Sequence, residues 1–208
     1  MITERSWQRC STQTFWGEEA SCSHVLQIYE NEESFLNMLE GFAAGGLTVD
    51  DCVVIIATPA HLLELEQRLR SHGLNMDALS ATGQYVALNA EEVLTRFMVN
   101  EWPDYSLFMD AINDVFQKLP RQNRQVRAFG EMVVLLWEKG NSGATVMLEH
   151  LWNAYSEKES FSLFCAYPKS AFPDDANTSL SNICKAHSKI ITGSEKSITE
   201  LSFSQVVI

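Results

Sequence analysis

The feature that most constrains the fold is a series of short, continuous apolar runs that alternate with longer segments of helical period. The clearest run, Cys52-Val-Val-Ile-Ile-Ala57, is mostly β-branched, which is typical of a strand covered on both faces. Strands separated by helices of about 10–15 residues imply right-handed crossovers and a largely parallel sheet. The sequence therefore predicts an α/β fold, with helices flanking a mostly parallel sheet.

The same patterns place the individual elements. Strands are expected at residues 24–29, 52–57, 85–88, 126–129 and 161–166. Helices are expected after the caps Asn31 and Asp104, and at residues 62–72 (opened by Pro59), 90–99, 132–139, 144–156 and 176–187. Gly45-Gly46 is expected to end the first helix, as glycine commonly does.

Length and composition predict a single domain. The chain has 208 residues, of which 46% are hydrophobic and 20% charged, and this is enough for one core. Residues 1–23 have no clear period and are expected to form a poorly ordered arm held by its aromatic residues. Residues 24–192 are expected to form the folded domain, and residues 193–208 a closing strand or a tail.

The charge balance excludes several classes of partner. The chain carries 15 basic and 27 acidic residues, a net charge of −12, which argues against binding nucleic acid or an anionic membrane through a basic face. No run approaches the roughly 18 apolar residues of a membrane span, and no apolar signal segment is expected. Five cysteines without C-x-x-C spacing argue against a disulfide framework and for a reducing cytoplasm.

Polar residues at the strand ends indicate where a ligand would bind. In open parallel sheets, ligands bind beyond the carboxyl ends of the strands. The expected strand ends place along one edge Tyr29, Thr58, Asn89, Glu131 and Tyr167. Glu131 is either a helix N-terminal acid favoured by the helix dipole or a polar group in the crevice. Glu149, in an otherwise apolar helix, is either solvated or paired, or it lines a pocket.

Common catalytic and cofactor motifs are missing from the sequence. The five histidines show no H-x-H or H-x-x-x-H spacing, so no metal site is predicted, and Cys165 is expected to be an inert buried thiol. A phosphate-binding loop would follow the first strand, yet Tyr29 to Phe35 holds no glycine or lysine and three acids. No cofactor is therefore predicted.

Five motifs follow one another along the chain. They are His24-x-x-x-x-Tyr29, Gly130-Glu-Met-x-x-x-Leu-Trp137, Leu148-Glu-x-Leu-Trp-Asn153, Leu163-x-Cys-Ala-Tyr-Pro168 and Ile183-Cys-x-x-His187. Together they resemble the MEDS domain, the methanogen/methylotroph DcmR-type sensory domain, over about residues 24–192. The resemblance implies a RecA/KaiC-like three-layer sandwich without a functional ATP-binding loop, which agrees with the acidic segment after the first strand.

The resemblance also implies a function and a set of residues. It implies a non-catalytic sensory domain that binds a small, hydrocarbon-derived ligand and signals to a regulatory partner. The chain is expected to be a stand-alone sensor, or one that acts through a histidine kinase or transcriptional regulator on a separate chain. The ligand-binding residues carried over by position are His24, Tyr29, Glu131, Glu149, Trp152, Asn153, Cys165 and Tyr167. His187 also belongs to the pattern, and the pattern leaves open whether these residues contact ligand or maintain the fold.

Two other functions stay open at this point. One is a residual nucleotide-binding, KaiC-like ATPase, which the fold favours and the missing phosphate loop opposes. The other is a protein-interaction scaffold, which would bind a regulator or form a homo-oligomer through an exposed apolar patch.

Overall fold

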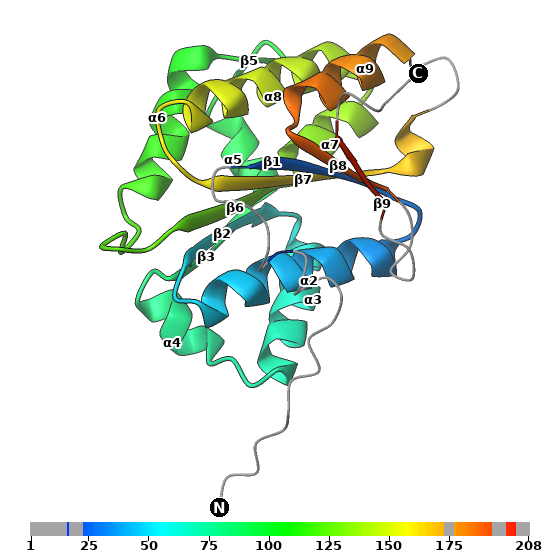
Figure 1. The fold of residues 1–208 in the computed structure, drawn as a ribbon. Helices are drawn as coiled ribbons and strands as arrows, with labels where there is room; N and C mark the ends of the chain where they lie inside the picture. Colours follow the sequence, from blue (N-terminus) through cyan, green and yellow to red (C-terminus); the bar gives the residue numbers. More distant parts are fainter. Residues whose placement is uncertain (1–15, 17–22, 173–176, 193–198, 203–208) are drawn as a thin grey trace, which may run out of the picture.

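The chain forms a three-layer α/β structure around one seven-stranded sheet (Figure 1). The computed structural model describes residues 16, 23–172, 177–192 and 199–202, with 177–179 and 199–202 described by their backbone. The strands of the sheet are β1 His24–Tyr29, β2 Cys52–Ala57, β3 Tyr85–Asn89, β6 Val126–Gly130, β7 Ser162–Pro168, β8 Lys189–Thr192 and β9 Thr199–Ser202. Their order is β3-β2-β6-β7-β1-β8-β9. Every pairing is parallel except that of β8 with β9, so the predicted mostly parallel sheet is confirmed.

Helices cover both faces of this sheet (Figure 1). One face carries α2 Glu32–Thr48, α3 Pro59–Ser71 and α4 Met76–Ala81. The other carries α5 Ala90–Thr95, α6 Tyr105–Phe116, α7 Met132–Glu138, α8 Ser142–Ser156 and α9 Asn177–Ala186. A two-stranded hairpin, β4 Met98–Val99 with β5 Trp102–Pro103, follows α5, and a short 3₁₀ turn, η1 Lys169–Ala171, follows β7. None of the helices in the described part of the chain has the length and hydropathy of a membrane-spanning segment.

The sheet separates two hydrophobic cores. Successive side chains of a strand point to opposite faces, and β7 shows the consequence. Leu163, Cys165 and Tyr167 belong to the core beneath α5–α9, whereas Phe164 and Ala166 belong to the core beneath α2–α4. Every polar residue on a strand is therefore assigned to one core or the other by its position in the alternation.

The predicted helix starts are confirmed by their caps. The Asn31 Oδ1 accepts a hydrogen bond from the Ser34 N–H at 2.9 Å, and the Asp104 Oδ1 accepts one from the Leu107 N–H at 2.9 Å. Each satisfies an N–H group that has no partner within its own helix.

The segments around residues 90–103 and 189–192 differ from the expectation. The segment 90–99 is not one helix, because α5 ends at Thr95 and the chain turns into the β4–β5 hairpin through Asn100 and Glu101, both with positive φ. Strand β8 was not predicted. Within the expected closing strand or tail, residues 193–208, the structure describes residues 199–202, which form strand β9.

The N-terminal arm is described only in part. Most of residues 1–23 lie outside the described residues. Trp16 is buried, packs between Phe42 and Phe164, and donates a hydrogen bond from Nε1 to the carbonyl of Met38 at 3.1 Å. It thereby fastens that point of the arm to α2 and β7.

The glycine pair does not end α2, which continues to Thr48. The reason for the second glycine is packing. A Cβ at Gly46 would lie 2.9 Å from the Val53 Cγ2 and 2.8 Å from the Arg127 Cδ, so only glycine lets α2 approach β2 this closely. A Cβ at Gly45 would meet its nearest neighbour at 3.6 Å, an ordinary contact.

This difference predicts opposite effects from adjacent substitutions. Gly46→Ala should lower the free energy of unfolding by about 1–3 kcal/mol, because the added methyl overpacks a buried contact. Gly45→Ala should raise it by up to about 1 kcal/mol, because alanine favours a helix interior. Urea unfolding of both variants measures the difference, and equal stability of the two would contradict the packing explanation.

Candidate functional site

Six polar side chains meet inside the core between the sheet and α8, and we call them the polar cluster. They come from β1, α8, β7 and the end of α9, and they are His24, Glu149, Asn153, Cys165, Tyr167 and His187. Glu149, Cys165 and Tyr167 have no exposed surface, and His24 and His187 are also buried. Burying polar groups costs free energy unless they are paired. A set of buried polar groups as dense as this one therefore marks a candidate functional site.

Strand register and helix period bring these residues together. His24 lies on the α8 side of β1, two residues before Leu26 of the same core. Leu26 pairs in register with Cys165 of β7, so His24 and Cys165 are close on one face. On α8, Glu149 and Asn153 are four residues apart and therefore lie on one side of the helix.

The Glu149 carboxyl group is the centre of the cluster. Its Oε1 accepts a hydrogen bond from the Tyr167 hydroxyl at 2.6 Å. Its Oε2 lies 3.8 Å from the Cys165 Sγ, which donates to it. The same oxygen lies 3.5 Å from the Nε2 of His24 and 3.6 Å from the Nε2 of His187.

Hydrogen bonds outside the centre fix both imidazole rings. The Asn153 amide donates from Nδ2 to the Ala186 carbonyl at 2.9 Å, so its Oδ1 accepts from the Nδ1 of His24 at 2.9 Å. The Nδ1 of His187 donates to the Ile183 carbonyl at 2.7 Å. A neutral imidazole has one donor and one acceptor nitrogen. Both Nε2 atoms therefore present lone pairs to the centre.

Burial shifts the pKa values of the cluster so that the neutral form of each group is favoured. Burial raises the pKa of Glu149 to about 8, against the hydrogen bonds from Tyr167 and Cys165, which lower it. Burial lowers the pKa of His24 to about 4, against the hydrogen bond with Asn153, and it also lowers the pKa of His187. Groups whose pKa values are moved this way, beside specific partners, are enriched in functional sites.

The other predicted residues lie elsewhere. Tyr29 is on the opposite face of the sheet, where its ring stacks on Phe35 at 5.1 Å. Trp152 packs edge-on against Phe108 at 5.2 Å as a core residue. Tyr29 and Glu131 pack on the α2–α4 side of the sheet, so the sheet separates them from the polar cluster.

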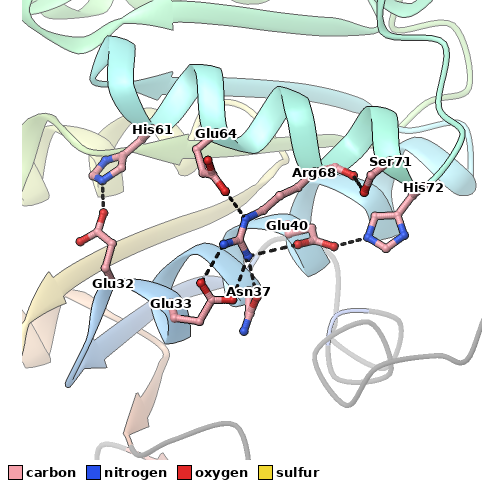
Figure 2. Close-up of polar contacts among 9 residues, drawn as sticks. All are labelled: Glu32, Glu33, Asn37, Glu40, His61, Glu64, Arg68, Ser71 and His72. Carbon is pink, nitrogen blue, oxygen red and sulfur yellow. Dashed lines mark hydrogen bonds and ion pairs between the residues drawn. The ribbon is translucent and has the colours of Figure 1, made fainter.

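Glu131 follows β6, as predicted, but it stabilises a neighbouring helix rather than its own. Its Oε2 accepts a hydrogen bond from the Thr58 N–H, at the start of α3, at 2.7 Å. Its Oε1 forms a hydrogen bond with the Nδ1 of His61 at 2.7 Å. The Nε2 of His61 bonds Glu32 of α2 (Figure 2). The hydrogen bond with Glu131 raises the pKa of His61 to about 9, so the imidazolium forms a charged link between α2, α3 and β6.

A second set of ion pairs continues this link along the two helices (Figure 2). Arg68 of α3 contacts Glu33 at 2.8 Å and Asn37 at 2.7 Å on α2, and Glu64 at 2.9 Å on its own helix. These contacts were not predicted from the sequence, because they depend on how α2 packs against α3. They fasten the two helices and carry no sign of chemistry.

An open groove lies apart from both sets of residues. It has a volume of about 600 Å³ and is bounded by α5, β4 and the turn between α7 and α8. Its lining includes Leu94, Met98 and Leu136 among charged residues such as Glu101 and Lys139. None of the predicted ligand-binding residues lines it.

The chain is similar to known proteins in both sequence and fold. The family model described as "MEthanogen/methylotroph, DcmR Sensory domain" (MEDS) matches residues 23–188. A protein from Pyrococcus horikoshii OT3, known from a structural study, superposes with a TM-score of 0.57 at 11% identity, covering 91% of this chain and 90% of that one. A KaiC-like protein from the same archaeon gives 0.57 at 10% identity, covering 86% and 77%. No curated protein matches. At these identities the two structures show a shared KaiC-like fold alone.

The His61 link predicts how stability changes in alkaline solution. A histidine whose pKa is raised by folding adds stability that is fully present below pH 6.5 and is lost as the pH rises through about 9. The contribution should be on the order of 1 kcal/mol, because solvent screens a partly exposed ion pair. Urea unfolding across this range should show a decline in the wild type that His61→Gln lacks. His150→Gln, at an exposed position of α8, should keep the wild-type decline, and a decline of equal size in His61→Gln would contradict the assignment.

Proposed function

The chain belongs to the MEDS family of sensory domains, and we propose that it binds a small ligand at the carboxyl end of β7 and signals to a regulatory partner. The observation that carries the proposal is the buried Tyr167–Glu149 hydrogen bond at this end of the sheet. A polar pair at the edge of an apolar core can orient a ligand whose remaining surface is apolar.

Aromatic rings beside Tyr167 supply the apolar wall. The Trp137 ring lies edge-on to the Tyr167 ring at 6.5 Å, and the Phe172 ring lies at 5.5 Å. Both are only partly buried. The Trp137 Nε1 donates to the Ala171 carbonyl at 2.6 Å, which holds the indole in place. This wall suits a hydrocarbon-derived ligand that carries one polar atom, the class that the family resemblance implies.

The polar cluster offers a route from this ligand to the C-terminal part of the domain. Glu149 contacts Tyr167 through one oxygen and the two histidines through the other. His187 lies between α9 and β8, and Ser188 hydrogen-bonds the backbone of His24. A ligand that binds one arrangement of the cluster better than another would shift the position of α9 and β8. We propose this region as the contact for a histidine kinase or transcriptional regulator on a separate chain.

The residues after β1 favour a non-catalytic domain over a nucleotide-binding one. The first turn of α2 holds Glu32 and Glu33, and its Ser34 N–H is already bonded to Asn31. The pKa of Tyr29 is raised by burial and then by the nearby charges of Glu32, Glu131 and Glu138. Phosphate groups prefer free N–H groups and positive charge, so this acidic edge disfavours ATP.

The ligand proposal is tested by thermal unfolding with a panel of small alcohols, thiols and haloalkanes of one to four carbons. A member that binds only the native state should raise the melting temperature of the wild type. Tyr167→Phe should abolish that rise, because it removes the hydroxyl paired with Glu149. Tyr155→Phe is the matched control, since its buried hydroxyl on α8 has no hydrogen-bond partner among the described residues. A rise that survives in Tyr167→Phe, or no rise with any member, would contradict the proposal.

The nucleotide alternative is tested in the same assay. Millimolar Mg-ATP should leave the melting temperature unchanged, because the segment after β1 lacks the groups that hold phosphates. A clear rise, with phosphate release over time, would instead support a residual ATPase.

A further inference from the structure

We propose that the polar cluster binds one divalent transition-metal ion, with zinc the best match, through the Nε2 atoms of His24 and His187, the Sγ of Cys165 and the Oε2 of Glu149. This goes beyond the proposed function, because the ion would be held whether or not a small ligand binds beside Tyr167. The family pattern includes all four residues, but no metal site was predicted from the sequence, because the residues come from four separate elements and show no short ligand spacing.

Four of the six separations between these atoms match those of a tetrahedral site. All four lie within 4.8 Å of one another. Four of their separations are 3.4 Å from the His24 Nε2 to the Cys165 Sγ, 3.5 Å and 3.6 Å from the two Nε2 atoms to the Glu149 Oε2, and 3.8 Å from the Sγ to that oxygen. Zinc bonds of about 2.0–2.3 Å at tetrahedral angles put neighbouring ligand atoms about 3.3–3.8 Å apart.

The orientation of the donors is already that of metal ligands. Metal-binding histidines usually donate their other ring nitrogen to a carbonyl or carboxylate, which fixes the ring. Here His187 donates to the Ile183 carbonyl and His24 to the Asn153 amide oxygen. The Tyr167 hydroxyl holds the carboxyl oxygen that faces away from the centre. Three of the four ligands therefore have a supporting hydrogen bond.

One nitrogen atom of the cluster has no hydrogen-bond partner in the described part of the chain, and a metal ion would supply a partner for its lone pair. The Nε2 of His187 is buried and has no hydrogen-bond partner within the described residues. The Glu149 Oε2 lies 3.6 Å from this nitrogen, which is beyond hydrogen-bond distance. A buried nitrogen in this position costs free energy, and coordination to a metal ion would remove that cost.

Charge also favours a divalent ion. Binding would release the Cys165 thiol proton, and the Glu149 carboxyl proton where it is present, to solvent. The resulting thiolate and carboxylate carry two negative charges, which neutralise a divalent cation inside the core. Two nitrogens, one sulfur and one oxygen suit zinc rather than calcium or magnesium, which prefer oxygen ligands. Because the protein fills all four positions, the site is a closed, structural one.

The test uses the full chain, stripped of metal with a chelator and then titrated with zinc or cobalt(II). Zinc should bind at about one ion per chain and raise the melting temperature, because it binds the native state. Cobalt(II) should give the strong visible bands of a tetrahedral site and a thiolate-to-cobalt charge-transfer band. A folded wild-type chain that binds neither ion would overturn the proposal.

Variants separate this site from adventitious binding. Cys165→Ser should remove the thiolate-to-cobalt band, and His187→Gln should abolish the tetrahedral spectrum. Asn153→Ala should weaken zinc binding by roughly 10–100-fold, because it releases the His24 ring. Cys52→Ser is the matched control, since Cys52 is a free thiol buried in β2, and it should keep the wild-type spectrum.

The outcomes stay distinguishable where a variant fails to fold. Circular dichroism identifies such a variant. The cobalt spectrum of the wild type shows whether a thiolate binds the ion, so this question does not depend on the variant. A charge-transfer band that persists in folded Cys165→Ser, or disappears in Cys52→Ser, would overturn the assignment. The small-molecule panel can be repeated on the metal-free chain, so a failed metal site and a failed ligand site give different results.

Discussion

The burial of the sheet on both faces is the constraint on which the rest of this structure depends. Because strand residues alternate between two cores, a polar residue on β1 or β7 must be satisfied on the side to which its position assigns it. His24 and Tyr29 are on the same strand, but they are five positions apart and therefore face opposite cores. His24 joins the enclosed polar cluster, whereas Tyr29 lies at the partly open edge next to α2.

A histidine lies beside a glutamate on each side of the sheet, and burial decides which protonation state each pair adopts. His61 and Glu131 meet at a partly exposed position, where hydrogen bonding to the carboxylate raises the histidine pKa to about 9. His24 and Glu149 meet in the core, where burial lowers the histidine pKa to about 4 and raises that of the carboxyl group to about 8. The first pair is an ion pair that fastens helices. In the second pair the histidine keeps the neutral form that can coordinate a metal ion, whereas the carboxyl group must release its proton to do so.

The sequence predicted the features that depend on local pattern. The strand runs, the caps at Asn31 and Asp104, the position of Glu131 after a strand and the family resemblance all follow from neighbouring residues. The contacts that these residues make could not be predicted in the same way, because the contacts depend on packing between distant segments. His187 meets His24 from the far end of the domain, so no short-range histidine spacing could reveal the cluster. Gly46 is the same case on a smaller scale, since its role depends on Val53 and Arg127 rather than on its own helix.

The proposed ligand site and metal site share a single carboxyl group, and this sharing gives the proposed sensor its coupling. The Oε1 of Glu149 accepts from Tyr167, whereas its Oε2 faces the two histidines and Cys165. A ligand that competes for the Tyr167 hydroxyl would leave Oε1 without its donor and so alter the negative charge on Oε2, the metal-binding oxygen. By linkage, an ion bound at Oε2 would change ligand affinity by the same factor in return. Because Tyr167 and Glu149 have no exposed surface, such a ligand reaches the hydroxyl only through a local opening at the end of β7, and the change then reaches α9 through His187.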